Sequence, residues 1–256
     1  MKKYNCIFIL VFIFSWTHNA TAEKMLSLNN GCLSAKYETN KVQSAAHNSK
    51  NIWAVILGVC ENKHPGQNLS DACNEANKMW NFFYNYDNGS IPQSQIIRLT
   101  GKGASRSNLI STLNDVCSRM GPNDVLFFYY YAHGTTYGID CYDNTVSYND
   151  LNSIFSRSAG RLIVCFAYSC YSGSYQIPEN ASFALVAVAE GIAWTHPNFS
   201  SILIEGLQGS AVRRNETAIT VRGIYEYLNR VLNPMGVFPV VKYGKYNPEA
   251  PLLYVK

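Results

Sequence analysis

A histidine and a cysteine stand at the ends of two apolar segments of the chain. His133 follows the run FFYYYA, and Cys170 follows the run LIVCFAYS, 37 residues later. The thiolate of a cysteine is its nucleophilic form, and because a free thiol has a pKa of about 8.5, it needs a neighbouring base or positive group. An imidazole within hydrogen-bond reach supplies that base and later protonates a leaving amine. The pair therefore predicts acyl transfer, with a chance pairing of two strand-end residues as the alternative.

Small residues beside the pair fit the same chemistry. Gly134 comes directly after the histidine, where it lets backbone approach a substrate and aims an N–H at a developing oxyanion. The N–H of Cys170 is the second donor expected, and loss of one such donor costs about 2.7–4 kcal/mol of transition-state stabilisation. The sequence SGS at 172–174 permits a tight turn away from the nucleophile.

Continuous apolar runs are predicted to form buried strands that position these residues. Runs without polar alternation are typical of strands covered on both faces. A shorter strand is expected at 95–99. Amphipathic stretches between the runs predict two helices, one over 68–86 with Ser70 as its cap and one capped by Ser105. The buried runs lie at 52–59, 124–131, 161–168 and 182–189.

Strands and helices alternate along the chain, which favours an α/β fold with a parallel-rich sheet. The predicted fold is a three-layer sandwich, in which a mostly parallel central sheet of about six strands has helices on both faces. Right-handed crossovers place the carboxyl ends of parallel strands on one edge, where α/β proteins carry their sites. His133 and Cys170 are therefore expected at that edge, in one domain spanning residues 51–256.

The amino terminus has the pattern of a secretory signal peptide. Lys2 and Lys3 precede an apolar run at 6–16 and the small-residue sequence Ala-Thr-Ala at 20–22. The run is shorter than the roughly 20 apolar residues that span a bilayer. We expect cleavage after residue 22 and a secreted or periplasmic protein, with an uncleaved anchor as the alternative. Residues 23–50 are polar and are interpreted as an extension or removable pro-segment, or as a simple linker.

The composition of the chain limits the kinds of partner that we expect it to bind. The 256 residues are 47% hydrophobic and 15% charged, and 21 Lys plus Arg against 17 Asp plus Glu give a formal charge of +4. This excess is small and no long basic run carries it, so nucleic acid is not an expected partner. No membrane partner is expected once the signal is removed. A protein or peptide substrate is the expected partner.

The chain has eight cysteines, and removal of the signal with Cys6 leaves an odd number. One thiol is then either free for chemistry or paired between molecules. Cys60, Cys117 and Cys165 lie in apolar runs and are predicted to be small buried hydrophobic residues. Disulfides among six of the seven remaining cysteines also stay open, and their connectivity is not specified by the sequence. No C-x-x-C pair is present and the chain has five histidines, so a structural zinc site is not expected.

The two strand-end motifs resemble the signature strands of the caspase-like cysteine peptidases. This group includes caspases, metacaspases, legumains and gingipains, and the likeness is to the catalytic p20 domain. The matching segments are Phe127–Gly134 (FFYYYAHG) and Leu162–Gly173 (LIVCFAYSCYSG), and 69–79 (LSDACNEANKM) is similar to a metacaspase helix. The resemblance extends over roughly 51–256. It implies a cysteine endopeptidase in which Cys170 and His133 are the catalytic dyad.

The resemblance also implies a substrate pocket, for which Glu75, Tyr168 and Glu190 are the predicted substrate-binding residues, with departures from the family pattern. Tyr168 stands where metacaspases usually carry Asp, and Tyr131–Ala132 stands in place of their Ser-Gly. Glu75 matches an acidic position of the family helix, so it slightly favours a basic residue before the cleaved bond. Glu190 and Trp194 follow the strand after the nucleophile, where the substrate-binding loop usually lies. For Glu75 and Glu190, a solvated surface charge is the alternative interpretation.

Several alternatives stay open at this stage. No cofactor is predicted; calcium is weakly supported, because Asp140, Asp143 and Asp150 are the only carboxylates near the corresponding family site. The string CYSGS at 170–174 also resembles the legumain pentapeptide, which implies a peptidase or transpeptidase. A catalytically silent caspase-like domain that binds a partner is another interpretation. Self-processing and a homodimer are further alternatives.

Overall fold

The computed structural model of the chain describes residues 48–193 and 198–254. The predicted signal peptide and most of the predicted extension lie outside the described residues, as does Trp194. The predicted boundaries at residues 22 and 50 therefore stay predictions. No helix among the described residues is long and apolar enough to cross a membrane.

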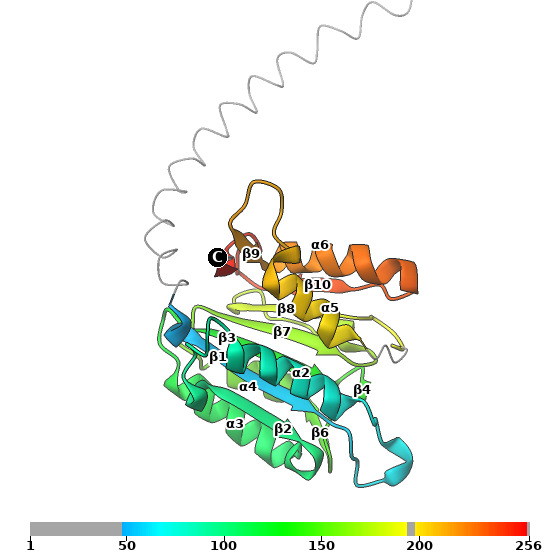
Figure 1. Cartoon of the computed structure of the whole chain (residues 1–256). Helices are drawn as coiled ribbons and strands as arrows, with labels where there is room; N and C mark the ends of the chain where they lie inside the picture. Colours follow the sequence, from blue (N-terminus) through cyan, green and yellow to red (C-terminus); the bar gives the residue numbers. More distant parts are fainter. Residues whose placement is uncertain (1–47, 194–197, 255–256) are drawn as a thin grey trace, which may run out of the picture. The chain divides into compact units, whose positions relative to one another are not determined.

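A six-stranded sheet forms the centre of the described domain (Figure 1). Its strands are β1 Ile52–Gly58, β2 Ile96–Thr100, β3 Val125–Tyr131, β7 Leu162–Tyr168, β8 Phe183–Ala187 and β10 Val240–Tyr243. Their order is β10-β8-β7-β3-β1-β2, and all neighbours are parallel except β10, which runs antiparallel to β8. The strands β1, β3 and β7 are buried along their whole length, which confirms the interpretation of the continuous apolar runs.

Helices cover both faces of this sheet and give it two separate cores. The helices are α2 Ala72–Asn85, α3 Arg106–Arg119, α4 Tyr148–Phe155, α5 Phe199–Glu205 and α6 Val221–Leu232. On β1, Ile52 and Ile56 belong to the core under α2, α5 and α6, whereas Trp53 and Leu57 belong to the core under α3 and α4. Side chains that alternate along a strand between two cores require cover on both faces. The predicted three-layer α/β sandwich is thereby confirmed.

Two small sheets accompany the central one. Their strands are β4 Gly134–Thr135, β5 Gly138–Asp140, β6 Thr145–Ser147, β9 Ala218–Thr220 and β11 Pro251–Tyr254. The strands β4, β5 and β6 form an antiparallel meander directly after the predicted catalytic histidine. The strand β9 pairs with β11 near the end of the described chain.

The starts of two helices test the predicted caps. Ser105 caps α3 as predicted, because its hydroxyl accepts a hydrogen bond from the N–H of Asn108 at 3.3 Å. Ser70 does not cap α2: the helix begins one residue later than that cap requires, with Asp71 at the N-cap position and no side-chain cap. The start of α2 is instead tied covalently to the loop after β1.

That tie is a disulfide between Cys60 and Cys73. The interpretation of Cys60 as a small buried hydrophobic residue is therefore wrong, and the disulfide is one of those that the sequence left open. Cys117 and Cys165 are free and buried, as that interpretation predicted for them. Close packing explains the pairing: a Cβ at Gly58 would lie 2.5 Å from the carbonyl oxygen of Ala72, so the glycine lets α2 approach the end of β1.

Candidate active site

The predicted dyad emerges from two neighbouring strands. β3 and β7 are parallel, and Tyr131 pairs with Tyr168 at their carboxyl ends. His133 and Cys170 each lie two residues beyond this pair, so both leave the sheet at the same edge and the same level. The expectation of a shared edge is confirmed, and it follows from the parallel register of the two buried strands.

Gly134 brings the histidine loop into contact with the cysteine loop. A Cβ at this position would lie 2.6 Å from the carbonyl oxygen of Cys170 and 2.7 Å from the hydroxyl oxygen of Ser169. Real Cβ atoms do not approach backbone this closely, so only glycine allows the two loops to touch. The loop that carries His133 and the loop that carries Cys170 are therefore packed together.

The backbone N–H groups of Gly134 and Cys170 lie beside this contact. The N–H of Asp140 donates to the carbonyl oxygen of His133 at 3.1 Å, so these two residues form a hydrogen-bonded pair of the β4–β5 hairpin. Gly134 and Ile139 are then the next, non-hydrogen-bonded pair, which turns the Gly134 N–H away from β5. Within the described part of the chain, the N–H of Cys170 donates to no backbone or side-chain acceptor. The role of these two N–H groups as oxyanion donors stays a prediction.

Cys170 differs from the other free cysteines in exposure. Among the described residues, Cys117, Cys141 and Cys165 are buried, whereas Cys170 is partly exposed. Burial raises the pKa of Cys117 to about 11 and that of Cys141 to about 12, and it raises the pKa of Cys165 strongly. These three thiols stay protonated near neutral pH, so none of them is an alternative nucleophile.

The loop after the nucleophile is held against the segment that follows β8. Tyr171 adopts a left-handed backbone conformation, with φ of 55°, and its N–H donates to the carbonyl oxygen of Gly191 at 2.6 Å. The N–H of Gly173 donates to the carbonyl oxygen of Ala189 at 2.8 Å. Residues Ser172–Ser174 form a single 3₁₀ turn, which confirms the predicted tight turn.

Tyr148 is a site-supporting residue that sequence reasoning did not identify. Its hydroxyl lies 3.5 Å from the carbonyl oxygen of Thr135 and 3.4 Å from that of Tyr171, so its one hydrogen is shared between the histidine and cysteine loops. Its ring stacks on Tyr175 with the centroids 4.4 Å apart. The first residue of a helix gives no sequence signal for this role, because both carbonyls come from distant parts of the chain.

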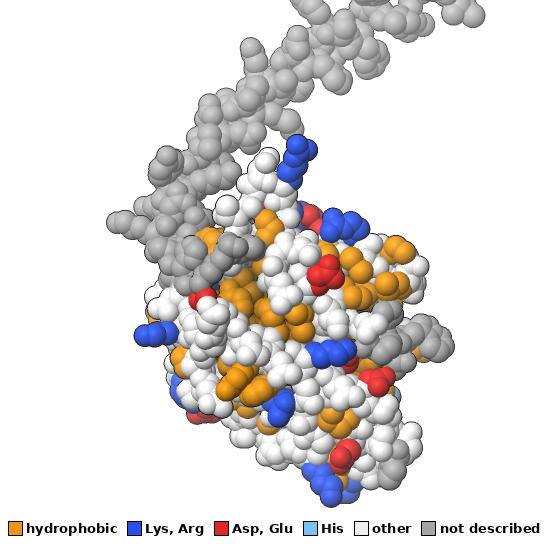
Figure 2. Space-filling model, in the orientation of Figure 1, with side chains coloured by type: hydrophobic (Ala, Val, Ile, Leu, Met, Phe, Trp, Pro, Cys, Tyr) orange, Lys and Arg blue, Asp and Glu red, His pale blue; other side chains and the backbone are white. Residues whose placement is uncertain are grey.

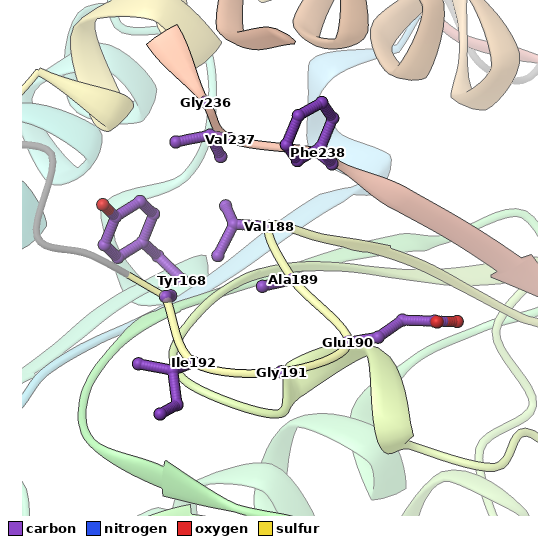
Figure 3. Close-up of a pocket in the computed structure, with 10 residues that line it drawn as sticks. Tyr168, Val188, Ala189, Glu190, Gly191, Ile192, Gly236, Val237 and Phe238 are labelled. Carbon is purple, nitrogen blue, oxygen red and sulfur yellow. The ribbon is translucent and has the colours of Figure 1, made fainter.

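A pocket of about 210 Å³ borders the cysteine loop (Figure 3). Two of the three predicted substrate-binding residues, Tyr168 and Glu190, line it. Val237 and Phe238 also line it, and their place more than sixty positions after the nucleophile gave no sequence signal. The pocket is lined by Tyr168, by residues 188–193 and by residues 236–238.

Glu75, the third predicted substrate-binding residue, does not line this pocket. Its side chain is buried, one carboxylate oxygen accepts the N–H of Ser200 at 2.8 Å, and the other pairs with the ammonium of Lys78 at 2.6 Å. The carboxylate of Glu75, a residue of α2, therefore lies against the first turn of α5. This burial follows from helical periodicity, because Glu75 lies on the inward-facing stripe of α2 together with Ala76 and Met79.

The carboxylates considered for calcium have protein partners. The carboxylate of Asp143 accepts the N–H of Arg106, Asp150 pairs with the guanidinium of the same arginine, and Asp140 accepts the hydroxyl of Thr145. Among the described residues, no group of three or more His, Cys, Asp or Glu side chains is placed to hold a metal ion.

A second hollow, of about 500 Å³, lies on the face formed by α2 and α5. Figure 2 shows hydrophobic side chains gathered on the side of the domain that α2, α5 and α6 cover. No residue of the predicted dyad lines this hollow. Its apolar lining residues are Phe82, Tyr86, Ile204, Leu207 and Tyr254.

Comparisons with known proteins place this geometry in a family. The model of Peptidase family C25, a family of cysteine peptidases, matches residues 17–193, well over half of the chain. A search of curated proteins found no match.

Solved structures share the fold at low sequence identity. The chain is similar to caspase-1 from Spodoptera frugiperda, with a TM-score of 0.61 at 12% identity, over 82% of this chain and 92% of that chain. It is also similar to protein GSU0716 from Geobacter sulfurreducens, with a TM-score of 0.58 at 13% identity, over 80% of this chain and 100% of that chain. With a caspase-like sheet and a family match that includes both strand-end motifs, the chain belongs to Peptidase family C25.

Proposed function

We propose that this protein is an exported cysteine endopeptidase that uses Cys170 and His133 as its catalytic dyad. The observation that carries the proposal is the contact of Gly134 with the backbone of Cys170, which joins the two strand-end motifs in one place. Membership of a cysteine peptidase family supports the reaction class.

The proposed reaction proceeds through an acyl-enzyme. The thiolate sulfur of Cys170 attacks the carbonyl carbon of the peptide bond, and the proton of the thiol passes to His133. His133 then protonates the leaving amine as the C–N bond breaks, which leaves a thioester. A water molecule, deprotonated by His133, attacks the thioester; the acid product leaves and the thiol is regenerated. The N–H groups of Gly134 and Cys170 stabilise the oxyanion of both tetrahedral intermediates.

Export is the second part of the proposal. The charged end, short apolar run and small-residue site at 1–22 support it, and so does the Cys60–Cys73 disulfide, because disulfides persist in oxidising compartments. We expect the protein recovered from outside the cytoplasm to begin at Glu23. Intact mass and amino-terminal sequencing would detect this, and a recovered protein that retains residues 1–22 would contradict cleavage.

The dyad is tested with the exported full chain, a mixed peptide library and the variant Cys170→Ala. We expect the variant to lose cleavage to the uncatalysed background while its melting temperature stays close to the parent value. Cys117→Ala is the matched control, because it removes a buried thiol far from the contact of the two loops. Cleavage by Cys170→Ala at the parent rate would rule out the proposed nucleophile.

Thiol labelling separates an active enzyme from a catalytically silent domain. Native protein treated briefly with iodoacetamide at neutral pH should be alkylated at Cys170 and not at the three buried cysteines. Peptide mapping assigns the label. Of the two cysteines outside the described residues, Cys6 leaves with the proposed signal peptide, and a Cys32→Ser background removes the other. Labelling of Cys170 no faster than that of Cys117 would favour the silent domain. Product masses in the presence of an added amine would distinguish hydrolysis from transpeptidation.

A further inference from the structure

We propose that the pocket beside Cys170 accepts an apolar side chain, aliphatic or aromatic, from the substrate residue whose carbonyl group is attacked. This inference rests on the proposed peptidase function and adds the substrate class to it. It replaces the expectation of a basic residue, because that expectation depended on Glu75, which lies outside the pocket.

The pocket lies within reach of the attacked residue. Tyr168 forms part of its lining and is the last residue of β7, two residues before Cys170, so the two lie at most about 7 Å apart along the chain. The opposite lining, residues 188–193, is hydrogen-bonded to the cysteine loop, and the thiol of Cys170 lies 3.6 Å from the carbonyl oxygen of Ala193. A side chain next to a carbonyl held at the sulfur therefore enters this pocket.

Most side chains that line the pocket are apolar, and the polar side-chain groups of the lining are the Tyr168 hydroxyl and the Glu190 carboxylate. Figure 3 shows the ring of Tyr168 and the side chains of Val188 and Val237 converging on one space. The Tyr168 ring is fixed there, because it stacks on Tyr131 with the centroids 4.3 Å apart and packs on Phe199 at 4.8 Å.

Exposed apolar side chains mark the mouth of the same pocket. Ile192 and Phe238 are each 65% exposed, and Met235, one residue before the pocket lining begins, is 52% exposed. Large apolar side chains that gather at the surface mark interaction sites, because their exposure to water is unfavourable. An apolar substrate side chain would remove this surface from water.

Charge in the pocket does not favour a basic substrate residue. Among the described lining residues, Glu190 is the only acidic or basic one, and in Figure 3 its carboxylate points away from the space between Tyr168, Val188 and Val237. A lysine or arginine side chain in that space would lose solvation without gaining an ion pair from these residues. The cavity of about 210 Å³ exceeds the roughly 150 Å³ that holds a benzene molecule in an engineered protein cavity, so a phenyl ring fits.

The test measures kcat/KM for peptides that differ only in the residue before the cleaved bond. We expect leucine and phenylalanine peptides to exceed the alanine peptide by about 10- to 200-fold, the range for added apolar groups in a pocket, and to exceed arginine and lysine peptides by at least as much. Equal rates across the series, or a preference for arginine or lysine, would overturn the proposal.

Variants at the mouth sharpen the assignment. Ile192→Asp and Phe238→Asp change exposed residues, so they leave the core intact, and each should reduce the preference for leucine over alanine about tenfold. Tyr84→Ala, which changes an exposed aromatic residue on α2, is the matched control and should leave the preference unchanged. Glu190→Gln should also leave it unchanged; a loss of activity toward arginine peptides in this variant would assign a basic pocket instead.

A binding measurement keeps this inference separate from the proposed function. The Cys170→Ala protein is titrated with fluorescent leucine, phenylalanine, alanine and arginine peptides. Tighter binding of the apolar peptides that is lost in Ile192→Asp would support the pocket assignment. This result would hold even if neither the parent protein nor any variant cleaved a peptide. In that case the catalytic proposal alone would fail. Equal or absent binding of the four peptides would overturn the pocket assignment.

Discussion

The amino and carboxyl ends of strands β3 and β7 differ in how their polar groups are paired. At the amino ends, these groups form hydrogen bonds with one another. At the carboxyl ends, the chain turns into loops that carry His133 and Cys170, and the backbone N–H of Cys170 has no acceptor among the described residues. Between these ends, both strands are buried along their whole length.

The amino ends are joined by Asp124. Its carboxylate accepts hydrogen bonds from the indole N–H of Trp53 and the N–H of Gly121, each at 2.9 Å, and its carbonyl oxygen accepts the N–H of Arg161 at 2.8 Å. One residue thus links β1, the turn after α3 and the start of β7. Because these donors and acceptors are already paired, they are not available to a substrate.

The carboxyl ends are characterised instead by close backbone contact and by backbone strain. Gly134 touches the backbone of Cys170, and Tyr171 holds a left-handed conformation that is unfavourable for a bulky residue. The comparison predicts that changes at the amino ends lower stability and leave the specific activity intact. Changes at the carboxyl ends should lower the specific activity and leave the stability intact.

The largest effect is expected from Gly134→Ala. The added methyl group would displace the cysteine loop and the oxyanion donor, so kcat should fall by about 10²- to 10³-fold or more. Gly103→Ala is the control, because a Cβ there meets nothing within 4 Å. Steady-state kinetics on both variants, with circular dichroism to confirm folding, provide the measurement. An unchanged kcat in Gly134→Ala would contradict the expectation that changes at the carboxyl ends lower the activity.

Asp124→Ala should lower the free energy of unfolding by about 1–3 kcal/mol, because it leaves the Trp53 and Gly121 donors without their acceptor. Activity per folded molecule should not change. Urea titration measures the loss, with Asp115→Ala as the control, since Asp115 forms an exposed ion pair with Arg119. A fall in specific activity with unchanged stability would reverse the assignment of the two ends.

Tyr148→Phe should have a smaller effect, on activity. Loss of one bridging hydroxyl weakens the link between the two loops by about 0.5–1.5 kcal/mol, which corresponds to a decrease in kcat of about 2- to 10-fold. KM should change less than kcat, since the hydroxyl does not line the pocket. Tyr84→Phe serves as the control, and an effect on KM alone would remove Tyr148 from this positioning role.

The smallest effect concerns pH and the start of α4. Burial by itself raises the pKa of Asp150, but hydrogen bonds from Ser147 and the guanidinium of Arg106 outweigh it, so the pKa is lowered. Its contribution to stability is therefore present above the unfolded pKa of about 3.9 and disappears as pH falls through the lower folded value.

Asp150→Asn should accordingly cost no more than about 0.5 kcal/mol near pH 7, because solvent screens a side chain that is 37% exposed, and the difference from the parent protein should shrink as the pH falls below about 4. Thermal melts over this pH range provide the measurement. A difference that grows toward low pH would contradict the sign of the pKa shift.

Local patterns predicted much of the fold and the dyad. The uninterrupted apolar runs that end at Tyr131 and Tyr168 identified buried parallel strands, because side chains on both faces of such strands must be apolar. Parallel strands then place their carboxyl ends at one edge, so two residues from distant motifs were expected to meet.

Only the tertiary structure decided the surroundings of that dyad. The pairing of Cys60 with Cys73, the burial of Glu75 beneath α5 and the part that Phe238 plays in the pocket depend on segments that meet after folding. A charged residue on a helix looks the same in sequence whether it faces solvent, a substrate or a neighbouring N–H group. The periodicity of a sequence specifies which face of an element is buried, whereas the contacts made by that face are set by the packing of the whole domain.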